Sequence, residues 1–233
     1  MRVLRGLCGH GGTTCDERGS VRGSNPRPPR QLPSIPKPLA KAFRWAFPGP
    51  AERRRLLALL ERPPRAAARA LLGQVLVRLG PRPLAARIVE TEAYLGFEDP
   101  AAHAYRGRTP RTEPLFGPAG TIYVYFIYGM HHCLNLTVDR PGVPGCVLIR
   151  AAEPLGARDA GSGRGPGKLC RLLKLDTRDS GRHLFASDSR LTLREGRPPR
   201  HVQVTTRIGI RHAAERPLRF FDADSPAVSA RRR

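Results

Sequence analysis

The chain has 233 residues, a hydrophobic fraction of 40% and a formal net charge of +22. These values fit one globular domain with a sizeable core and a tail, and the excess of arginine favours a polyanionic partner such as nucleic acid. No apolar run is long enough to span a bilayer, and the first ten residues lack the apolar core of a secretory signal. We therefore expect no membrane contact and an intracellular location.

Residues 1–44 are rich in Gly, Pro, Ser and Arg, which predicts a disordered basic tail. Cys8, His10 and Cys15 in this tail could ligate zinc. However, no second pair of ligands follows at metal-site spacing, so we expect no metal there. The chain has five cysteines. They form no CxxC pair, and their odd number argues against a disulfide framework.

A regular apolar pattern begins at Pro50 and predicts both helices and strands. In chain order these are helices over 51–60 and 65–72, strands over 74–79, 85–94, 121–128, 132–138 and 146–151, a helix over 168–175, and strands over 191–193, 202–209 and 218–221. Neither a repeat nor a regular βαβ alternation is present. We therefore expect a mixed α+β domain over 45–225, followed by a basic C-terminal tail over 226–233.

The predicted strand 85–94 carries two carboxylates. In a regular strand Ile88, Glu90, Glu92 and Tyr94 share one face, because alternate side chains point to the same side. Burying these acids is costly unless they line a polar pocket. Alternatively, both acids face solvent on an edge strand. The spacing alone leaves both interpretations open.

The predicted hairpin about Gly129 is rich in tyrosine. Tyr123 and Tyr125 share one face of its first strand, and Tyr128 lies at its tip. We interpret Tyr123 as a core residue and assign functional roles to the other two. A tyrosine at a hairpin tip is well placed to enter a duplex as a wedge. Flat aromatic faces beside an acid suit a pocket that clamps a planar ring. The positive net charge of the chain favours a nucleobase as this ring.

The motifs of this central region resemble those of the alkyladenine (3-methylpurine) DNA glycosylases. The matching motifs are 90–94 with His103, 123–125 with 128–130, 133–135, 147–151 and 165–170. They occur in the order and at the spacing of that family from about residue 71 to residue 221. Two features depart from the family. Thr112 stands where relatives often carry Asn, and the first fifty residues have no counterpart.

The resemblance implies one mixed α+β domain around a curved antiparallel β-sheet, with flanking helices and a β-hairpin that inserts into DNA. It implies a base-excision-repair glycosylase that flips alkylated or deaminated purines out of double-stranded DNA. Such an enzyme hydrolyses the N-glycosidic bond and leaves an abasic site. On the same basis we expect a monomer with no cofactor and no metal, in the cytoplasm on nucleoid DNA.

The resemblance also implies roles for individual residues at the reacting bond. Glu92 would deprotonate the water that attacks C1′ of the sugar, and Arg150 would support the surroundings of that water. Tyr94, His103 and Tyr125 would enclose the flipped base. This fits the chemistry, because a carboxylate stabilises an oxocarbenium-like sugar while it acts as a general base.

Three further residues receive roles from the resemblance. Tyr128 would intercalate, Asn135 would crowd the exocyclic amine of normal guanine, and Lys168 would contact a backbone phosphate. A lyase activity would need an amine nucleophile. Because no lysine lies between Lys41 and Lys168, we expect a monofunctional enzyme.

The residues suggest three other interpretations. His103, His131 and His132 lack the spacing of a metal hydrolase site. The 161–168 stretch has the glycine content of a phosphate-binding P-loop but not its spacing. The serious alternative is a non-catalytic nucleic-acid-binding or damage-binding protein with stacking tyrosines. Binding alone does not require Glu92 in the pocket, since a carboxylate repels DNA.

Overall fold

The computed structural model describes residues 47–156 and 160–229. The tail expected over 1–44, with its candidate zinc ligands, lies outside the described residues. In the part of the chain that is described, no helix is both long enough and apolar enough to cross a membrane.

Three α-helices lie at the predicted places in the described chain. They are α2 (Pro50–Leu60), α3 (Pro64–Leu71) and α4 (Pro166–Leu172), and the short 3-10 helices are η1 (Gly96–Glu98), η2 (Glu113–Phe116), η3 (Ala160–Gly163) and η4 (Thr177–Asp179). Each α-helix begins at a proline, whose missing N–H costs nothing in the first turn. The prediction of 168–175 for the last helix was wrong at both ends.

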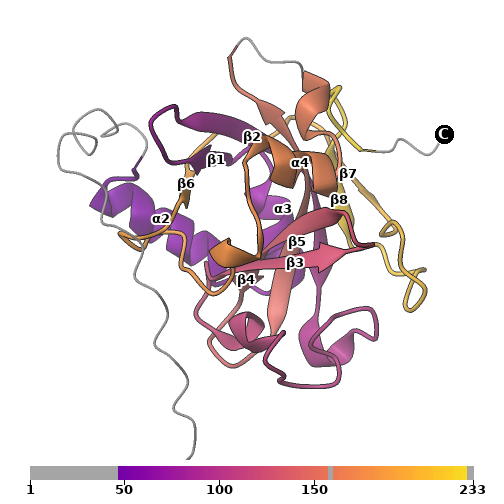
Figure 1. The fold of residues 1–233 in the computed structure, drawn as a ribbon. Helices are drawn as coiled ribbons and strands as arrows, with labels where there is room; N and C mark the ends of the chain where they lie inside the picture. The colour runs from indigo at the N-terminus through magenta and orange to yellow at the C-terminus, as the bar shows by residue number, and fades with distance from the viewer. Residues whose placement is uncertain (1–46, 157–159, 230–233) are drawn as a thin grey trace, which may run out of the picture. The chain divides into compact units, whose positions relative to one another are not determined.

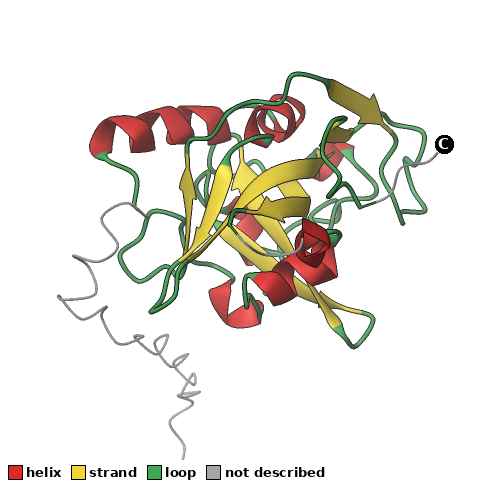
Figure 2. Cartoon of the chain, turned by 90° about the horizontal axis from the view of Figure 1, so that it is seen from above, coloured by secondary structure: helices red, strands yellow, loops and turns green. Residues whose placement is uncertain are grey.

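Eight strands of the described residues form one curled antiparallel sheet, as the α+β prediction requires (Figure 1). They are β1 (Val75–Arg78), β2 (Leu84–Tyr94), β3 (Ile122–Ile127), β4 (His131–Val138), β5 (Gly145–Pro154), β6 (Leu191–Arg194), β7 (Val202–Thr205) and β8 (Arg219–Asp222). The order is β3-β4-β5-β2-β1-β6, and β8 pairs with both β2 and β7. Figure 2 shows the helices arranged around this sheet.

The main apolar core joins the helices to the sheet. It includes Leu56 and Leu60 of α2, Leu71 of α3 and Leu169 of α4, all essentially inaccessible to solvent. A hydrogen bond also joins α3 to the sheet, because the Thr91 hydroxyl of β2 donates to the carbonyl oxygen of Ala68 in α3 at 2.8 Å. Burial of these side chains is the dominant force that holds the helices on the sheet.

The pairing of β2 with β5 is irregular at one point. The paired register passes over Val89 in β2 and Arg150 in β5. Ile88 and Ala93 therefore both reach the main core, although they are an odd number of residues apart and would face opposite sides of a regular strand. Val89 packs in a separate small cluster. The prediction that Ile88 shares a face with Glu90 was wrong, because an irregularity of this kind inverts the alternation of side chains.

The strand predicted over 202–209 ends early. β7 stops at Thr205, where its pairing with β8 ends. Arg207 then turns inward and forms a fully buried ion pair with Asp99, and it donates to the carbonyl oxygen of Ala93 at 3.0 Å. The chain beyond β7 is therefore a loop anchored on β2 rather than a longer strand.

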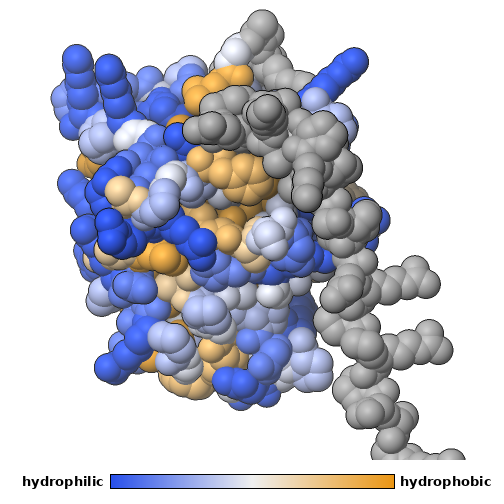
Figure 3. Space-filling model, turned by 90° about the vertical axis from the view of Figure 1, so that its left-hand side faces the viewer, coloured by the Kyte–Doolittle hydropathy of each residue, from blue (hydrophilic) through white to orange (hydrophobic). Residues whose placement is uncertain are grey.

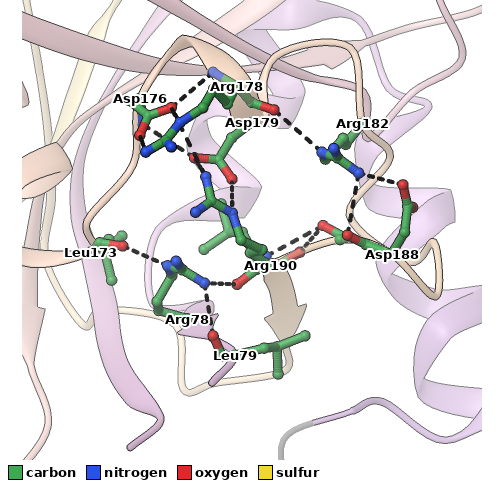
Figure 4. Close-up of polar contacts among 11 residues, drawn as sticks. Arg78, Leu79, Leu173, Asp176, Arg178, Asp179, Arg182, Asp188 and Arg190 are labelled. Carbon is green, nitrogen blue, oxygen red and sulfur yellow. Dashed lines mark hydrogen bonds and ion pairs between the residues drawn. The ribbon is translucent and has the colours of Figure 1, made fainter. Parts of the chain in front are cut away.

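A second polar network lies around Arg78, Asp179 and Arg190 (Figure 4). Asp179 of η4 is buried and accepts two hydrogen bonds from Arg190, at 2.9 and 2.8 Å. Arg78 at the end of β1 donates to the carbonyl oxygen of Leu173 at 2.8 Å. Arg78 also donates to the carbonyl oxygen of Arg190 at 3.1 Å, so charged hydrogen bonds join β1 to the distant stretch 173–190.

The described chain stays packed in the domain as far as Ser229. Ala227 and Val228 are fully buried, and the backbone N–H of Ser229 donates to Glu90 at 2.6 Å. These residues lie in the segment 226–233 that the sequence placed in a tail. The surface is more polar than the core. Figure 3 shows one face, on which hydrophilic side chains surround small apolar patches.

Candidate active site

A cleft of about 340 Å³ opens between the sheet, the start of α4 and the loop that follows β7. Its walls are formed by Tyr94, Ala101, His103, Leu115, Tyr123, Tyr125, Ile127, Tyr128, His131, Cys133, Asn135, Cys146, Leu148, Arg150, Pro166, Gly167, Ile208, Gly209 and Ile210. The size suits a small organic ligand, and the walls are mostly apolar and aromatic with a few polar groups.

Glu92 is buried directly behind two of these wall residues. Its side chain has no exposed surface. Oε1 accepts the backbone N–H of Ile208 at 2.8 Å and lies 3.3 Å from the guanidinium of Arg150. Oε2 accepts the hydroxyl of Tyr94 at 3.1 Å. Burial raises the pKa of Glu92 above its ordinary value, although Arg150 and the Ile208 N–H oppose this shift.

Arg150 lies between two buried carboxylates. Its Nε donates to Oε1 of Glu90 at 3.2 Å, while its other end faces Glu92. Glu90 also accepts from Nε of Arg219 at 2.6 Å. The two acids and the two arginines therefore balance in charge, which is the condition under which buried charges are tolerated. The solvent-exposed alternative for these acids is thereby excluded.

Tyr94 is fixed from two sides. Its hydroxyl bonds Glu92, and the guanidinium of Arg207 lies 4.6 Å from its ring centroid. Burial and the neighbouring carboxylate raise the pKa of Tyr94 well above its usual range, so the phenol stays neutral. The result is a rigid aromatic wall that also helps to hold the acid.

The opposite wall is a cluster of three rings. The centroids of His103 and Tyr125 lie 4.5 Å apart at an interplanar angle of 69°. The imidazole Nδ1 of His103 lies 2.9 Å from the hydroxyl of Tyr123, which is buried as predicted. Partial burial and the nearby Arg111 lower the pKa of His103, so the ring is neutral near pH 7. Burial also raises the pKa of Tyr125, and this wall therefore carries no charge.

Asn135 lies on the floor of the cleft with its amide fixed. Its Nδ2 donates to the carbonyl oxygen of Tyr123 at 3.3 Å, and its Oδ1 lies 4.0 Å from the thiol of Cys146. Cys133 and Cys146 are both buried. Burial raises the pKa of Cys146 to about 12, so this thiol stays protonated. Asn135 therefore presents a fixed polar edge between apolar groups.

The β3–β4 hairpin carries exposed apolar side chains at its tip. Tyr128 is 76% exposed, and Met130 is 67% exposed. Both Tyr128 and Gly129 have positive φ, at 54° and 66°. Glycine adopts this region freely, but a tyrosine does so at a cost. The hairpin thus displays a large aromatic ring at the mouth of the cleft.

Lys168 lies beside the cleft rather than in it. It is exposed on the first turn of α4, next to Gly167 in the wall. A Cβ added to Gly167 would lie 3.0 Å from the ring of His131, which explains why a glycine fits there. The departure at Thr112 concerns loop packing. Its hydroxyl accepts the N–H of Thr109 at 2.9 Å, and Thr112 is not one of the residues that form the cleft walls.

The structure brings most of the predicted site residues together. Six of them line one cleft: Tyr94, His103, Tyr125, Tyr128, Asn135 and Arg150. Glu92 contacts two of the six. Sequence inspection missed Ile208, which bonds the acid through its backbone, and the buried pair of Arg207 with Asp99. Neither Ile208 nor the Arg207–Asp99 pair lies in a sequence motif that would indicate its role. Across the described residues, no group of three or more His, Cys, Asp or Glu could hold a metal ion.

Comparisons with known proteins agree with this geometry. A family model described as "Methylpurine-DNA glycosylase" matches residues 58–226. A protein of Methanocella arvoryzae is 42% identical over 187 residues, covering 73% of this chain and 93% of its own length. One of Anaeromyxobacter dehalogenans is 48% identical over 178 residues, covering 74% and 83%. Both are named "Putative 3-methyladenine DNA glycosylase". The chain therefore belongs to the methylpurine-DNA glycosylase family.

Proposed function

We propose that this member of the methylpurine-DNA glycosylase family excises alkylated and deaminated purines from double-stranded DNA by hydrolysing the N-glycosidic bond. The observation that carries the proposal is the fully buried carboxylate of Glu92, held by Tyr94 and Arg150 directly behind the wall of an aromatic cleft. A protein that only bound DNA would have no use for a buried acid at this place, since it repels phosphate.

In the proposed reaction Glu92 acts as the general base. It takes a proton from a water that attacks C1′ of the flipped nucleotide, and its negative charge stabilises the oxocarbenium-like sugar. Arg150 and the backbone N–H of Ile208 fix the orientation of the carboxylate. The purine leaves with the bonding electron pair, and the DNA keeps an abasic sugar.

The uncharged aromatic rings in the walls favour lesions that carry positive charge. Tyr94 and Tyr125 are uncharged, and their ring faces attract a cationic alkylpurine more strongly than a normal base. A deaminated purine lacks this charge and would be held by stacking, at about 1–3 kcal/mol per base. Asn135 would exclude guanine by crowding its amine. Tyr128 would fill the space in the duplex that the flipped nucleotide leaves.

The remaining parts of the proposal concern the state of the enzyme. In this proposal the enzyme works as a monomer in the cytoplasm, on nucleoid DNA. None of the described residues that line the cleft is a lysine, so the enzyme would be monofunctional and leave strand cleavage to others.

A single-turnover assay on duplex DNA tests the proposal. The substrates carry one hypoxanthine, one ethenoadenine or alkylated purines, and wild type is compared with Glu92→Gln. We expect wild type to release the base and the variant to release it at least about 100-fold more slowly, with binding retained. The control is Glu195→Gln, since Glu195 is an exposed acid paired with Arg55, and its release rate should match wild type.

Two outcomes would contradict the proposal. Tight binding by wild type without release, on all of these lesions, would leave a damage-binding protein. Equal release by wild type and Glu92→Gln would show that another group is the base.

A further inference from the structure

A second buried acid lies behind the proposed base. Glu90 has no exposed surface and receives four hydrogen bonds. Oε1 accepts from Nε of Arg150 at 3.2 Å, from Nε of Arg219 at 2.6 Å and from the hydroxyl of Ser229 at 2.9 Å. Oε2 accepts the backbone N–H of Ser229 at 2.6 Å. The C-terminal segment thus supplies two of the four donors.

Arg150 is shared among these groups. Its Nε bonds Glu90, its NH1 lies 3.3 Å from Glu92, and its NH2 donates to the hydroxyl of Ser229 at 3.5 Å. Both carboxylates attract this guanidinium, and a carboxylate with fewer other donors keeps more uncompensated negative charge and attracts it more strongly. The distance from Arg150 to Glu92 therefore depends on how well the other donors satisfy Glu90.

The segment 226–229 is held firmly enough to act as such a donor. Ala227 and Val228 are buried, and Nε of Arg164 donates to the carbonyl oxygen of Val228 at 2.8 Å. Buried packing on one side and a charged hydrogen bond on the other fix the backbone that presents Ser229 to Glu90.

We propose that Glu90 and Ser229 are positioning residues, which together keep Arg150 in contact with Glu92. By satisfying Glu90, Ser229 prevents this acid from drawing the guanidinium away from the base. The inference rests on the proposed function in one respect, namely that Glu92 is the base that Arg150 serves. Neither Glu90 nor Ser229 forms a wall of the cleft, so neither is assigned contact with substrate.

The ionisation of Glu92 reports the position of Arg150. The titratable and charged groups that face this cluster are Arg150 of β5, Glu90 and Tyr94 of β2, Cys133 of β4, Arg207 of the loop after β7, and Arg219 of β8. Replacing Ser229 by alanine changes none of these groups. A change in the pKa of Glu92 in that variant must therefore come from rearrangement of the groups around it.

The test measures the Glu92 pKa directly in the full chain. Carbon-13 NMR follows the side-chain carboxyl, identified by its absence from the spectrum of Glu92→Gln. We expect Ser229→Ala to raise the Glu92 pKa, because Arg150 shifts toward Glu90. Single-turnover base release near neutral pH should slow by about tenfold, the size typical of a lost hydrogen bond to a charged group. DNA binding should not change.

Two matched variants separate positioning from packing. Ser229→Thr keeps the hydroxyl and should restore both the Glu92 pKa and the release rate. Ser189→Ala removes another buried hydroxyl, which donates to the carbonyl oxygen of Leu191 and not to Glu90. It should lower the thermal midpoint and leave the pKa and the rate as in wild type.

The outcomes distinguish this inference from the proposed function. An unchanged Glu92 pKa in Ser229→Ala, or an equal shift in Ser189→Ala, would overturn the positioning role whatever the enzyme does. A shifted pKa in a protein that releases no base would support the positioning role and reject the glycosylase proposal. An active wild type with an unmoved pKa would reject the positioning role alone.

Discussion

The carboxylate of Glu92 is held by donors from three parts of the chain: a tyrosine two residues further along β2, an arginine of β5 and a backbone amide beyond β7. Two opposing effects act on it. Burial favours the neutral acid, whereas the donors favour the carboxylate, and burial is the larger effect. A raised pKa makes a carboxylate a better general base, provided that it is ionised at the working pH.

This balance predicts the acid side of the pH–rate profile. Only the ionised form of Glu92 accepts a proton, so base release should fall as the pH drops through the pKa of Glu92. Because that pKa is raised, the fall should occur above the range of an ordinary glutamate. Single-turnover rates across pH on a neutral lesion such as hypoxanthine would show it. A rate that stays constant down to the range of an unperturbed carboxylate would contradict the assignment.

Residues that line the cleft could be predicted from the sequence, whereas most of the residues that hold them in place could not. Tyr94, His103 and Tyr125 stand in motifs with fixed spacing, so they could be found. Ser229 could not, because it lies 139 residues from Glu90 and nothing in the sequence around it indicates an acid as its partner. Ile208 acts through its backbone, which leaves no trace in the choice of side chain.

At the scale of elements, the loop after β7 is the part that completes the site. Its backbone reaches Glu92 through Ile208, and its anchor is the ion pair of Arg207 with Asp99, both fully buried. A buried pair adds little net stability compared with apolar packing, but it specifies one arrangement, and the loss of one partner leaves a charge uncompensated.

Removing Asp99 should therefore destabilise the protein and slow the reaction. We expect Asp99→Ala to cost about 3–5 kcal/mol in the free energy of unfolding, because Arg207 stays buried without its partner. The matched control is Glu113→Ala, which breaks an exposed pair with Arg108 and should cost about 1 kcal/mol or less. Urea unfolding of both variants would check this. Equal costs would show that the buried pair does not anchor the loop.

The elements themselves were largely predictable, and their irregularities were not. Helices and strands follow from apolar spacing, and all of the predicted ones are present with shifted ends. The irregular pairing at Val89 and Arg150 was missed, because strict alternation from Ile88 onward also gives a plausible strand. β7 was predicted too long, since its apolar pattern continues past Thr205 while its partner strand does not.

The whole molecule carries far more positive than negative charge, at +22 over the full chain. Such a charge draws the protein to DNA without regard to sequence and makes binding dependent on salt. Aromatic side chains at the mouth of the cleft would then act on whatever DNA this attraction brings. Affinity and lesion recognition would thus come from different parts of the molecule.

The contribution of Lys168 to this attraction can be measured. If Lys168 contacts a phosphate, Lys168→Gln should weaken binding to damaged and undamaged duplexes alike, and the slope of log K against log salt should decrease by about 1. Lys174→Gln removes the same charge two residues after the end of α4 and should leave the slope unchanged. Equal effects of both variants would mean that only the overall charge matters.

If Tyr128 enters the duplex as proposed, the shape of the hairpin tip places stability and activity in opposition. Tyr128 occupies a left-handed backbone conformation that glycine or asparagine would adopt more easily. Laboratory selection for heat resistance alone would thus favour the loss of this ring. A lineage that no longer needed the proposed activity would then gain stability by replacing the tyrosine at position 128.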